Sequence, residues 1–112
     1  MDETVYKRSN KGKAIKKDDG EVNLKLQSDT NNLMINKNIT IGRDKSCNFR
    51  IDDPLISRKH AFIEFISNVA YIKDLGSTNA TYVNNNPLKA NEQRRLRRGD
   101  IIKIGKTEIR IN

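Results

Sequence analysis

The chain has 112 residues with a formal net charge of +8, and charged residues make up 32% of it against 35% hydrophobic residues. This length suits a single domain with a modest core, and no apolar run approaches the roughly 20 residues that a membrane-spanning helix needs. The single cysteine, Cys47, cannot form a disulfide within the chain, and the N-terminal residues lack the apolar stretch of a secretory signal. We therefore expect a cytoplasmic protein that is neither inserted in a membrane nor stabilised by internal disulfides.

Residues 1–20 form the first predicted element, a flexible basic tail. They show no hydrophobic periodicity and are rich in Lys, Asp, Asn and Gly, a composition that buries too little apolar surface to order a segment. Within this tail, Thr4 directly follows Asp2 and Glu3. The acidic residues before it make Thr4 a candidate kinase target, and an unmodified threonine in a disordered segment is the alternative.

The rest of the chain, residues 21–112, is predicted to be a single all-β domain. Short β-rich or alternating runs cover residues 22–27, 33–35, 39–41, 49–51, 60–66, 69–74, 81–83, 101–104 and 107–111. Turn-forming stretches such as GRDKS, DDP, GSTN, NNNP and RRGD separate the runs. Many short strands at close spacing predict an antiparallel sandwich or barrel. Two hairpins are expected, one about Ser67-Asn68 and one about Gly105-Lys106.

Three polar stretches, residues 41–51, 53–65 and 74–88, follow one another at expected strand ends. If their loops meet at one end of the sandwich, five polar side chains converge there: Arg43, Ser57, Arg58, Thr78 and Asn79. Guanidinium forks and hydroxyl groups suit phosphate oxygens, and a carboxamide can pair with a peptide backbone. With little carboxylate among them, these residues predict an anion receptor and not an acid–base catalyst.

The order of these motifs resembles that of the forkhead-associated (FHA) domain. The carrying residues are Gly42-Arg43, Ser57-x-x-His60 and Ser77-x-Asn79-x-Thr81, with IDDPLISRKHA between them and LRRGDIIKIG near the end. The resemblance runs from about Val22 to Ile111. It implies a β-sandwich of about eleven strands, without catalytic activity, that binds phosphothreonine peptides as an adaptor in Ser/Thr kinase signalling. The partners implied are phosphothreonine proteins, including a Ser/Thr kinase or its substrates.

The resemblance also implies a role for each matched position. Arg43 and Ser57 contact the phosphate, and Arg58 assists from the same loop as Ser57. Thr78 adds a further phosphate hydrogen bond, and Asn79 holds the peptide main chain.

Two further positions are expected to support the site, and one departs from the family. Gly42 allows a turn, and His60 braces the binding loops from behind. At Ala80 the family usually has glycine. A left-handed alanine costs on the order of 1 kcal/mol, so we expect the turn to adjust slightly there.

The resemblance also suggests self-regulation, in which a phosphorylated Thr4 occupies the site of its own chain or of a neighbour.

The main rival function is a basic β domain that binds nucleic acid. The sequence RRLRRGD at residues 94–100 is the densest basic patch, and we interpret it as a solvated loop. The chain has three Tyr, three Phe and no Trp for base stacking. A third interpretation is a structural protein-interaction module whose phosphate site is not used. Ser57 and His60 lack the nucleophile elbow of a hydrolase, and one histidine and one cysteine predict neither metal nor cofactor.

Overall fold

The computed structural model describes residues 22–112, so the predicted tail and Thr4 lie outside the described residues. The described part contains eleven strands and no helix. Its strands are β1 (Lys25–Gln27), β2 (Asn32–Met34), β3 (Ile39–Gly42), β4 (Phe49–Arg50), β5 (Ala61–Ile66), β6 (Val69–Asp74), β7 (Thr81–Val83), β8 (Asn86–Pro87), β9 (Arg94–Arg95), β10 (Ile101–Ile104) and β11 (Thr107–Ile111). None of these residues belongs to a helix long and apolar enough to cross a membrane.

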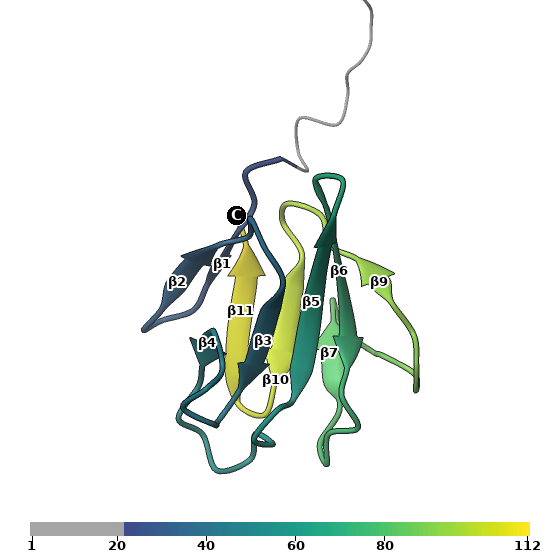
Figure 1. Ribbon diagram of the computed structural model, residues 1–112. Helices are drawn as coiled ribbons and strands as arrows, with labels where there is room; N and C mark the ends of the chain where they lie inside the picture. The colour runs from purple at the N-terminus through teal and green to yellow at the C-terminus, as the bar shows by residue number, and fades with distance from the viewer. Residues whose placement is uncertain (1–21) are drawn as a thin grey trace, which may run out of the picture.

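The strands form two sheets that face each other (Figure 1). One has six strands in the order β2-β1-β11-β10-β7-β8, and the other has five in the order β4-β3-β5-β6-β9. The strand pairs are antiparallel except for β3 with β4, where Ile41 lies opposite Phe49 in a parallel register. The predicted all-β sandwich of about eleven strands is therefore confirmed.

Isoleucine dominates the core between the sheets. In the five-stranded sheet, Ile39 lies opposite Ile63, which lies opposite Ile72, and each is fully buried. In the other sheet, Ile102 and Ile109 form a matching buried pair. Branching at Cβ restricts the side chain to rotamers that suit a pleated surface, so these residues favour strands and fill the space between two sheets.

Two strands were not predicted, and both occupy segments expected to be loops or turns. β8 follows Asn84 and Asn85, whose φ angles of 51° and 69° form a two-residue hairpin turn. β9 lies within the basic patch, where Arg95 pairs with Tyr71 of β6. The adjacent Leu96 is 1% exposed. The interpretation of residues 94–98 as a solvated loop is therefore wrong for their first half, because strand pairing and burial hold it against the sandwich.

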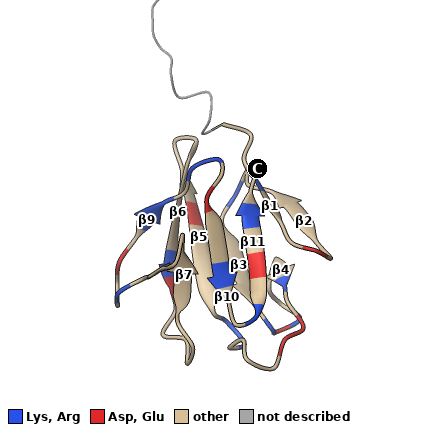
Figure 2. Ribbon diagram, turned by 180° about the vertical axis from the view of Figure 1, so that it is seen from behind, with Lys and Arg blue, Asp and Glu red and all other residues tan. Residues whose placement is uncertain are grey.

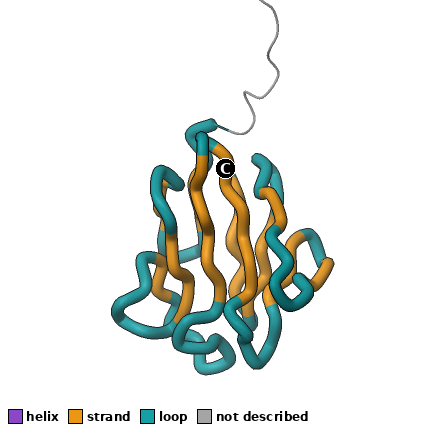
Figure 3. The backbone as a smooth tube through the Cα atoms, turned by 45° about the vertical axis from the view of Figure 1, so that its right-hand side comes forward, coloured by secondary structure: helices purple, strands orange, loops and turns teal. Residues whose placement is uncertain are grey.

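The loops gather at one end of the sandwich. The β3–β4, β4–β5 and β6–β7 loops lie at the end opposite the C-terminus, beside the β10–β11 turn (Figures 1 and 3). The β5–β6 hairpin turns at the other end, with Ser67 and Asn68 at φ 51° and 65°. The three polar stretches of the sequence therefore meet in space.

Candidate functional site

The end of β3 is fastened to the β4–β5 loop by backbone hydrogen bonds. The Arg43 amide donates to the Ser57 carbonyl at 3.1 Å, and the Asp44 amide donates to the Arg58 carbonyl, also at 3.1 Å. A Cβ on Gly42 would lie 2.1 Å from the Arg58 carbonyl oxygen. Gly42 is the last residue of β3, so the expectation that it allows a turn is wrong. It is required because two backbone segments approach each other closely.

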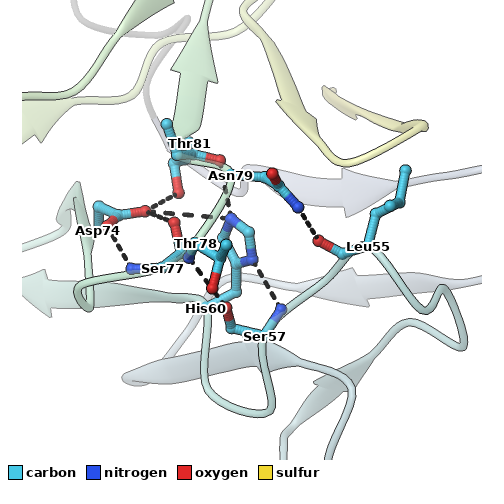
Figure 4. A network of polar contacts seen from close by, with 9 residues as sticks. Leu55, Ser57, His60, Asp74, Ser77, Thr78, Asn79 and Thr81 are labelled. Atoms are coloured by element: carbon cyan, nitrogen blue, oxygen red, sulfur yellow. Dashed lines mark hydrogen bonds and ion pairs between the residues drawn. The ribbon is translucent and has the colours of Figure 1, made fainter.

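His60 links the β4–β5 loop to the β6–β7 loop from within the protein. Its side chain is fully buried. Nδ1 accepts a hydrogen bond from the Ser57 amide at 3.1 Å, and Nε2 lies 2.8 Å from the Ala80 carbonyl oxygen (Figure 4). A backbone amide can only donate, so Nδ1 carries no proton and Nε2–H donates to Ala80. One neutral imidazole thus sets the spacing between the two loops.

Asp74, at the end of β6, holds the start of the β6–β7 loop. Its carboxylate accepts hydrogen bonds from the Ser77 amide at 2.8 Å, the Ser77 hydroxyl at 2.6 Å and the Thr81 hydroxyl at 2.7 Å (Figure 4). Burial opposes ionisation, but the hydrogen bonds from Ser77 and Thr81 outweigh it and hold the pKa of Asp74 below its ordinary value. Sequence reasoning missed this residue. The signal was an aspartate three residues before a serine in a turn, a spacing at which the carboxylate caps backbone and hydroxyl donors.

Ser57 and Thr78 come together on the outer side of this support. The Thr78 amide donates to Ser57 Oγ at 3.2 Å (Figure 4). This contact uses a lone pair of Ser57 Oγ and leaves its O–H available as a donor. Thr78 itself is exposed. The backbone of Thr78 and the hydroxyl of Ser57, which come from different loops, are therefore in direct contact.

The two arginines of the predicted set differ in how they are held. Arg43 Nε donates to the Ile56 carbonyl at 2.9 Å, which anchors the guanidinium while its terminal amino groups have no hydrogen bond to residues 22–112. Arg58 is exposed. Its backbone carbonyl accepts hydrogen bonds from the Asp44 amide and from the Cys47 thiol, the latter at 3.2 Å. Its guanidinium makes no hydrogen bond or ion pair within the described part of the chain. Arg43 is thus a preoriented cation, and Arg58 is a cation on a fixed backbone.

Asn79 contacts the β4–β5 loop. Its Nδ2 donates to the Leu55 carbonyl at 2.8 Å (Figure 4), and the carboxamide oxygen remains as an acceptor. The next residue, Ala80, has a φ of 64°. The expectation that this turn adjusts to avoid a left-handed alanine is therefore wrong. The hydrogen bond from His60 fixes the direction of the Ala80 carbonyl group, and this direction holds Ala80 in the left-handed conformation.

The charge of the described part is positive and dispersed. Residues 22–112 hold 16 Lys and Arg against 9 Asp and Glu, a net charge of +7. Figure 2 shows basic positions on β4, β9, β10 and β11 and in loops at both ends. Near the site, the Asp44 carboxylate accepts hydrogen bonds from the Ser46 hydroxyl and from the Ser46 amide. No group of three or more His, Cys, Asp or Glu side chains that could hold a metal ion occurs among these residues.

The arrangement offers hydrogen-bond donors at the loop end of the sandwich. The guanidinium of Arg43 and the hydroxyl of Ser57 belong to loops joined by direct backbone contacts, and Thr78 is held against Ser57. Such a set can hold a tetrahedral anion by charge-assisted hydrogen bonds. It contains no activated nucleophile, because the ring nitrogens of His60 are bonded to backbone groups and the imidazole is buried.

Comparisons with known proteins agree with this geometry. The FHA domain model matches residues 39–105. The chain is 42% identical over 69 residues to the FHA domain-containing protein FhaA of Mycobacterium tuberculosis, covering 62% of this chain and 12% of FhaA. It is 46% identical over 55 residues to the protein FraH of Nostoc sp., covering 49% of this chain and 19% of FraH. The chain therefore spans a small part of the length of these relatives.

Solved structures show the same sandwich. An FHA domain of an Arabidopsis thaliana hypothetical protein matches with a TM-score of 0.76 and 32% identity, over 90% of this chain and 93% of that one. The FhaA FHA domain, solved in complex with the intracellular domain of Rv3910, matches with a TM-score of 0.73 and 34% identity, over 80% and 99%. The agreement in sequence spans the same three loops that the sandwich brings together, and the chain belongs to the forkhead-associated (FHA) domain family.

Proposed function

We propose that this domain is a phosphothreonine-dependent peptide-binding adaptor without catalytic activity. The observation that carries the proposal is the convergence of Arg43, Ser57 and Thr78 at the loop end of the sandwich, with donors that face no partner among the described residues. A related structure, with 34% identity and a TM-score of 0.73, comes from a study of phosphothreonine-dependent FHA domain interactions. In this chain, Arg43 and Ser57 bind the phosphate, and Arg58 and Thr78 assist.

Asn79 completes the proposed site by holding the peptide main chain. Its Nδ2 is already bonded to the Leu55 carbonyl, so the carboxamide is oriented before a peptide arrives. The carboxamide oxygen then accepts from a peptide amide, and the second N–H can donate to a peptide carbonyl. Preorganisation of this kind lowers the entropic cost of binding.

The magnitudes suit a phosphorylation switch. A hydrogen bond to a charged group contributes roughly 1.5–3 kcal/mol. Loss of two such bonds on dephosphorylation costs about 3–6 kcal/mol, which corresponds to roughly a hundredfold to ten-thousandfold in affinity. Two or three charge-assisted contacts therefore suffice for a switch, even with a small interface.

Single substitutions test the assigned residues. We expect Arg43→Ala and Ser57→Ala to remain folded and to weaken phosphothreonine-peptide binding by about tenfold or more each, because each removes one hydrogen bond to a charged group. Lys37→Ala is the matched control, since it removes an exposed cation between β2 and β3 and leaves the site intact. A folded Arg43→Ala protein that binds the phosphopeptide as tightly as the Lys37→Ala protein would reject the assigned site.

The partners we propose are phosphothreonine-containing proteins, among them a Ser/Thr kinase or its substrates. We also propose a reducing, cytoplasmic location, which fits a buried free thiol at Cys47. Burial raises the pKa of this thiol and keeps it in the unreactive protonated form. Phosphopeptide capture from a cytoplasmic extract, compared between wild type and Arg43→Ala, would identify the partners.

Self-regulation through the N-terminal segment is the second part of this proposal. Thr4 lies eighteen residues before Val22, and a chain of that length spans up to roughly 60 Å when extended. The six-residue strand β5 is about 20 Å long, so a phosphorylated Thr4 can reach the loop end of its own domain. Tethering would raise the local concentration of the phosphothreonine to about the millimolar range.

A two-step experiment tests this self-regulation. Kinase treatment followed by mass spectrometry shows whether Thr4 is modified, and NMR relaxation then compares the mobility of residues 1–21 in wild type and Arg43→Ala. We expect phosphorylation to restrict residues near Thr4 in the wild type and not in the variant. Equal mobility in the two phosphorylated proteins would rule out binding of Thr4 to this site.

A further inference from the structure

A hollow of about 550 Å³ lies at the end of the sandwich opposite the proposed phosphopeptide site. Four apolar side chains line it, those of Val22, Met34, Ile35 and Phe65, and three asparagines complete the lining. One of these, Asn68, belongs to the β5–β6 turn, which Figure 1 shows at the end away from the β6–β7 loop. The volume lies within the roughly 300–1,000 Å³ typical of binding pockets.

The hollow opens onto the hydrophobic core. Ile35 is 2% exposed and belongs to the core, and the partly buried Phe65 packs against the core. Val22 and Met34 also line the hollow but remain 43% and 42% exposed, which places them among the six large hydrophobic side chains exposed within residues 22–112. Apolar side chains gathered around a hollow are typical of a surface that another segment covers.

The walls of the hollow are held in place by hydrogen bonds. The Phe65 amide donates to Asn38 Oδ1 at 2.9 Å, which ties the end of β5 to the residue before β3. The Val22 carbonyl accepts from Arg98 Nη2 at 2.6 Å, which fixes the backbone of Val22. The hollow is therefore formed in advance, and an apolar side chain can enter it without a rearrangement of the sandwich.

The segment that precedes Val22 can supply this side chain. Residues 1–21 join the described domain at Val22, which itself lines the hollow. Ile15 is the nearest large apolar residue on that side, seven residues before Val22. Seven residues span up to roughly 25 Å when extended. Between the two, Asp19-Gly20 is a dipeptide favoured in tight turns, so the chain can reverse direction and bring Ile15 back to the hollow.

The charges also favour this segment over a second copy of the chain. The carboxylates of Asp18, Asp19 and Glu21 come shortly before the Val22 carbonyl, to which the Arg98 guanidinium is bonded, and opposite charges attract. Two copies of a chain with a net charge of +8 repel each other. The short connection gives Ile15 a local concentration in about the millimolar range, which a separate molecule lacks.

We propose that Ile15 of the same chain occupies the hollow, packs against Met34 and Phe65, and closes this end of the core. The inference goes beyond the proposed function, because the hollow and the proposed phosphate site lie at opposite ends of the sandwich. Thr4 lies eleven residues before Ile15, a length that spans up to roughly 36 Å. Because β5 is only about 20 Å long, a docked Ile15 leaves phosphorylated Thr4 within reach of the loop end.

Oxidation of Met34 by dilute hydrogen peroxide tests the inference. The peroxide transfers one oxygen atom to the thioether and is reduced to water, and the rate of this step follows the exposure of the sulfur atom. We expect Met34 to be oxidised at least about threefold faster in Ile15→Asp than in the wild type, as peptide mass spectrometry measures. Met1 of the same chain reports the strength of the oxidant in each sample.

Two matched variants separate docking of Ile15 from a general effect of charge. Val5→Asp changes another β-branched residue of the same segment, and Ile66→Asp places the charge on an exposed side chain that does not line the hollow. Both should leave the oxidation rate of Met34 unchanged. Circular dichroism confirms that each variant is folded, and phosphopeptide affinity should be the same in all of them.

Methyl NMR tests the contact directly. We expect nuclear Overhauser cross-peaks from the Ile15 methyl groups to the Met34 methyl group and the Phe65 ring, unchanged on dilution. Cross-peaks that arise only between labelled and unlabelled copies would assign the hollow to a second copy and overturn the inference. Equal oxidation of Met34 in the wild type and Ile15→Asp would also overturn it. A failure of phosphopeptide binding would instead reject the proposed function and leave this inference standing.

Discussion

Ala80 is held in a left-handed conformation by its neighbours. Its φ is 64°, and its carbonyl oxygen accepts a hydrogen bond from the buried His60 imidazole at 2.8 Å. A Cβ in this region of backbone space is crowded by the following carbonyl group, at a cost of roughly 1–2 kcal/mol. The local strain persists because Thr81, the next residue, is fully buried and bonded to Asp74.

Ala80→Gly should therefore stabilise the domain. We expect the free energy of unfolding to rise by about 1 kcal/mol, because glycine adopts this conformation without a steric penalty. Urea denaturation measures the change. Asn68→Gly is the control, since Asn68 also has a positive φ, of 65°, but asparagine tolerates it well. An Ala80→Gly protein no more stable than the wild type would show that position 80 carries no strain.

Gly42 is constrained by space and not by its own dihedral angles. We expect Gly42→Ala to lower the free energy of unfolding by about 3 kcal/mol, because the new Cβ meets the backbone carbonyl of Arg58 and forces the β4–β5 loop to move. Gly76→Ala is the comparison. Gly76 has a φ of 75° and nothing within 4 Å of an added Cβ, so it should lose about 1 kcal/mol from backbone strain alone. Equal losses would contradict the steric explanation.

Among the elements, the β6–β7 loop is built outward from the end of β6. Asp74 fixes Ser77 and Thr81, which flank the two proposed ligand-contacting residues, Thr78 and Asn79. His60 then fixes the loop against the β4–β5 loop. The loop that presents Thr78 therefore depends on one carboxylate and one imidazole, neither of which touches the proposed ligand.

This arrangement makes the stability of the free domain depend on pH in the acidic range. The hydrogen bonds to Asp74 hold its pKa below the ordinary 3.8, so its folded carboxylate binds a proton less readily than the unfolded one. Its contribution to stability is therefore full at neutral pH and is lost as the pH falls through 3.8 and then through the lower folded pKa.

Asp74→Asn tests this dependence. We expect the variant to be less stable than the wild type at neutral pH and to lose less stability between about pH 6 and about pH 3, because it has no proton to take up at position 74. Ser77→Ala keeps the carboxylate but removes one donor, so its acid loss should lie between the two. Parallel pH profiles for wild type and Asp74→Asn would contradict the role of Asp74.

The elements that could be predicted are those with an apolar alternation. β5 and β6 carry their buried residues at every second position, so their pairing and the turn between them follow from the pattern. β9 has two arginines and no such pattern. It forms because β6 offers an unpaired edge and Leu96 enters the core. A pairing that depends on the partner strand is invisible in a local window.

The residues of the candidate site also fall into two groups, those that could be predicted from the sequence and those that could not. Arg43 and Ser57 stand out because their chemistry and order are distinctive, and the structure brings their loops together. Asp74 was missed because an acidic residue beside a turn is common, and its function depends in part on a donor from the next strand, the Thr81 hydroxyl.

At the scale of the whole molecule, the charge is positive but not concentrated. The described residues carry a net charge of +7, and Figure 2 shows it spread over strands and loops on more than one side. Binding to nucleic acid by charge neutralisation requires several aligned phosphate contacts. A phosphopeptide requires one focused site, and the proposed site at the loop end is of this kind.

Salt dependence separates these two modes of binding. We expect phosphopeptide affinity to fall less than about tenfold between about 50 mM and about 200 mM salt, because few charges are neutralised. Any binding to duplex DNA should weaken far more steeply. Ser57→Ala should reduce the first and not the second. A duplex bound more tightly than the phosphopeptide at the higher salt concentration would favour the nucleic-acid function.

The most direct test of the account is a calorimetric comparison of one peptide in two forms, with threonine and with phosphothreonine at the same position. We predict that the phosphorylated form binds at least about a hundredfold more tightly. Equal affinity for the two forms would contradict the central claim that this domain recognises phosphothreonine.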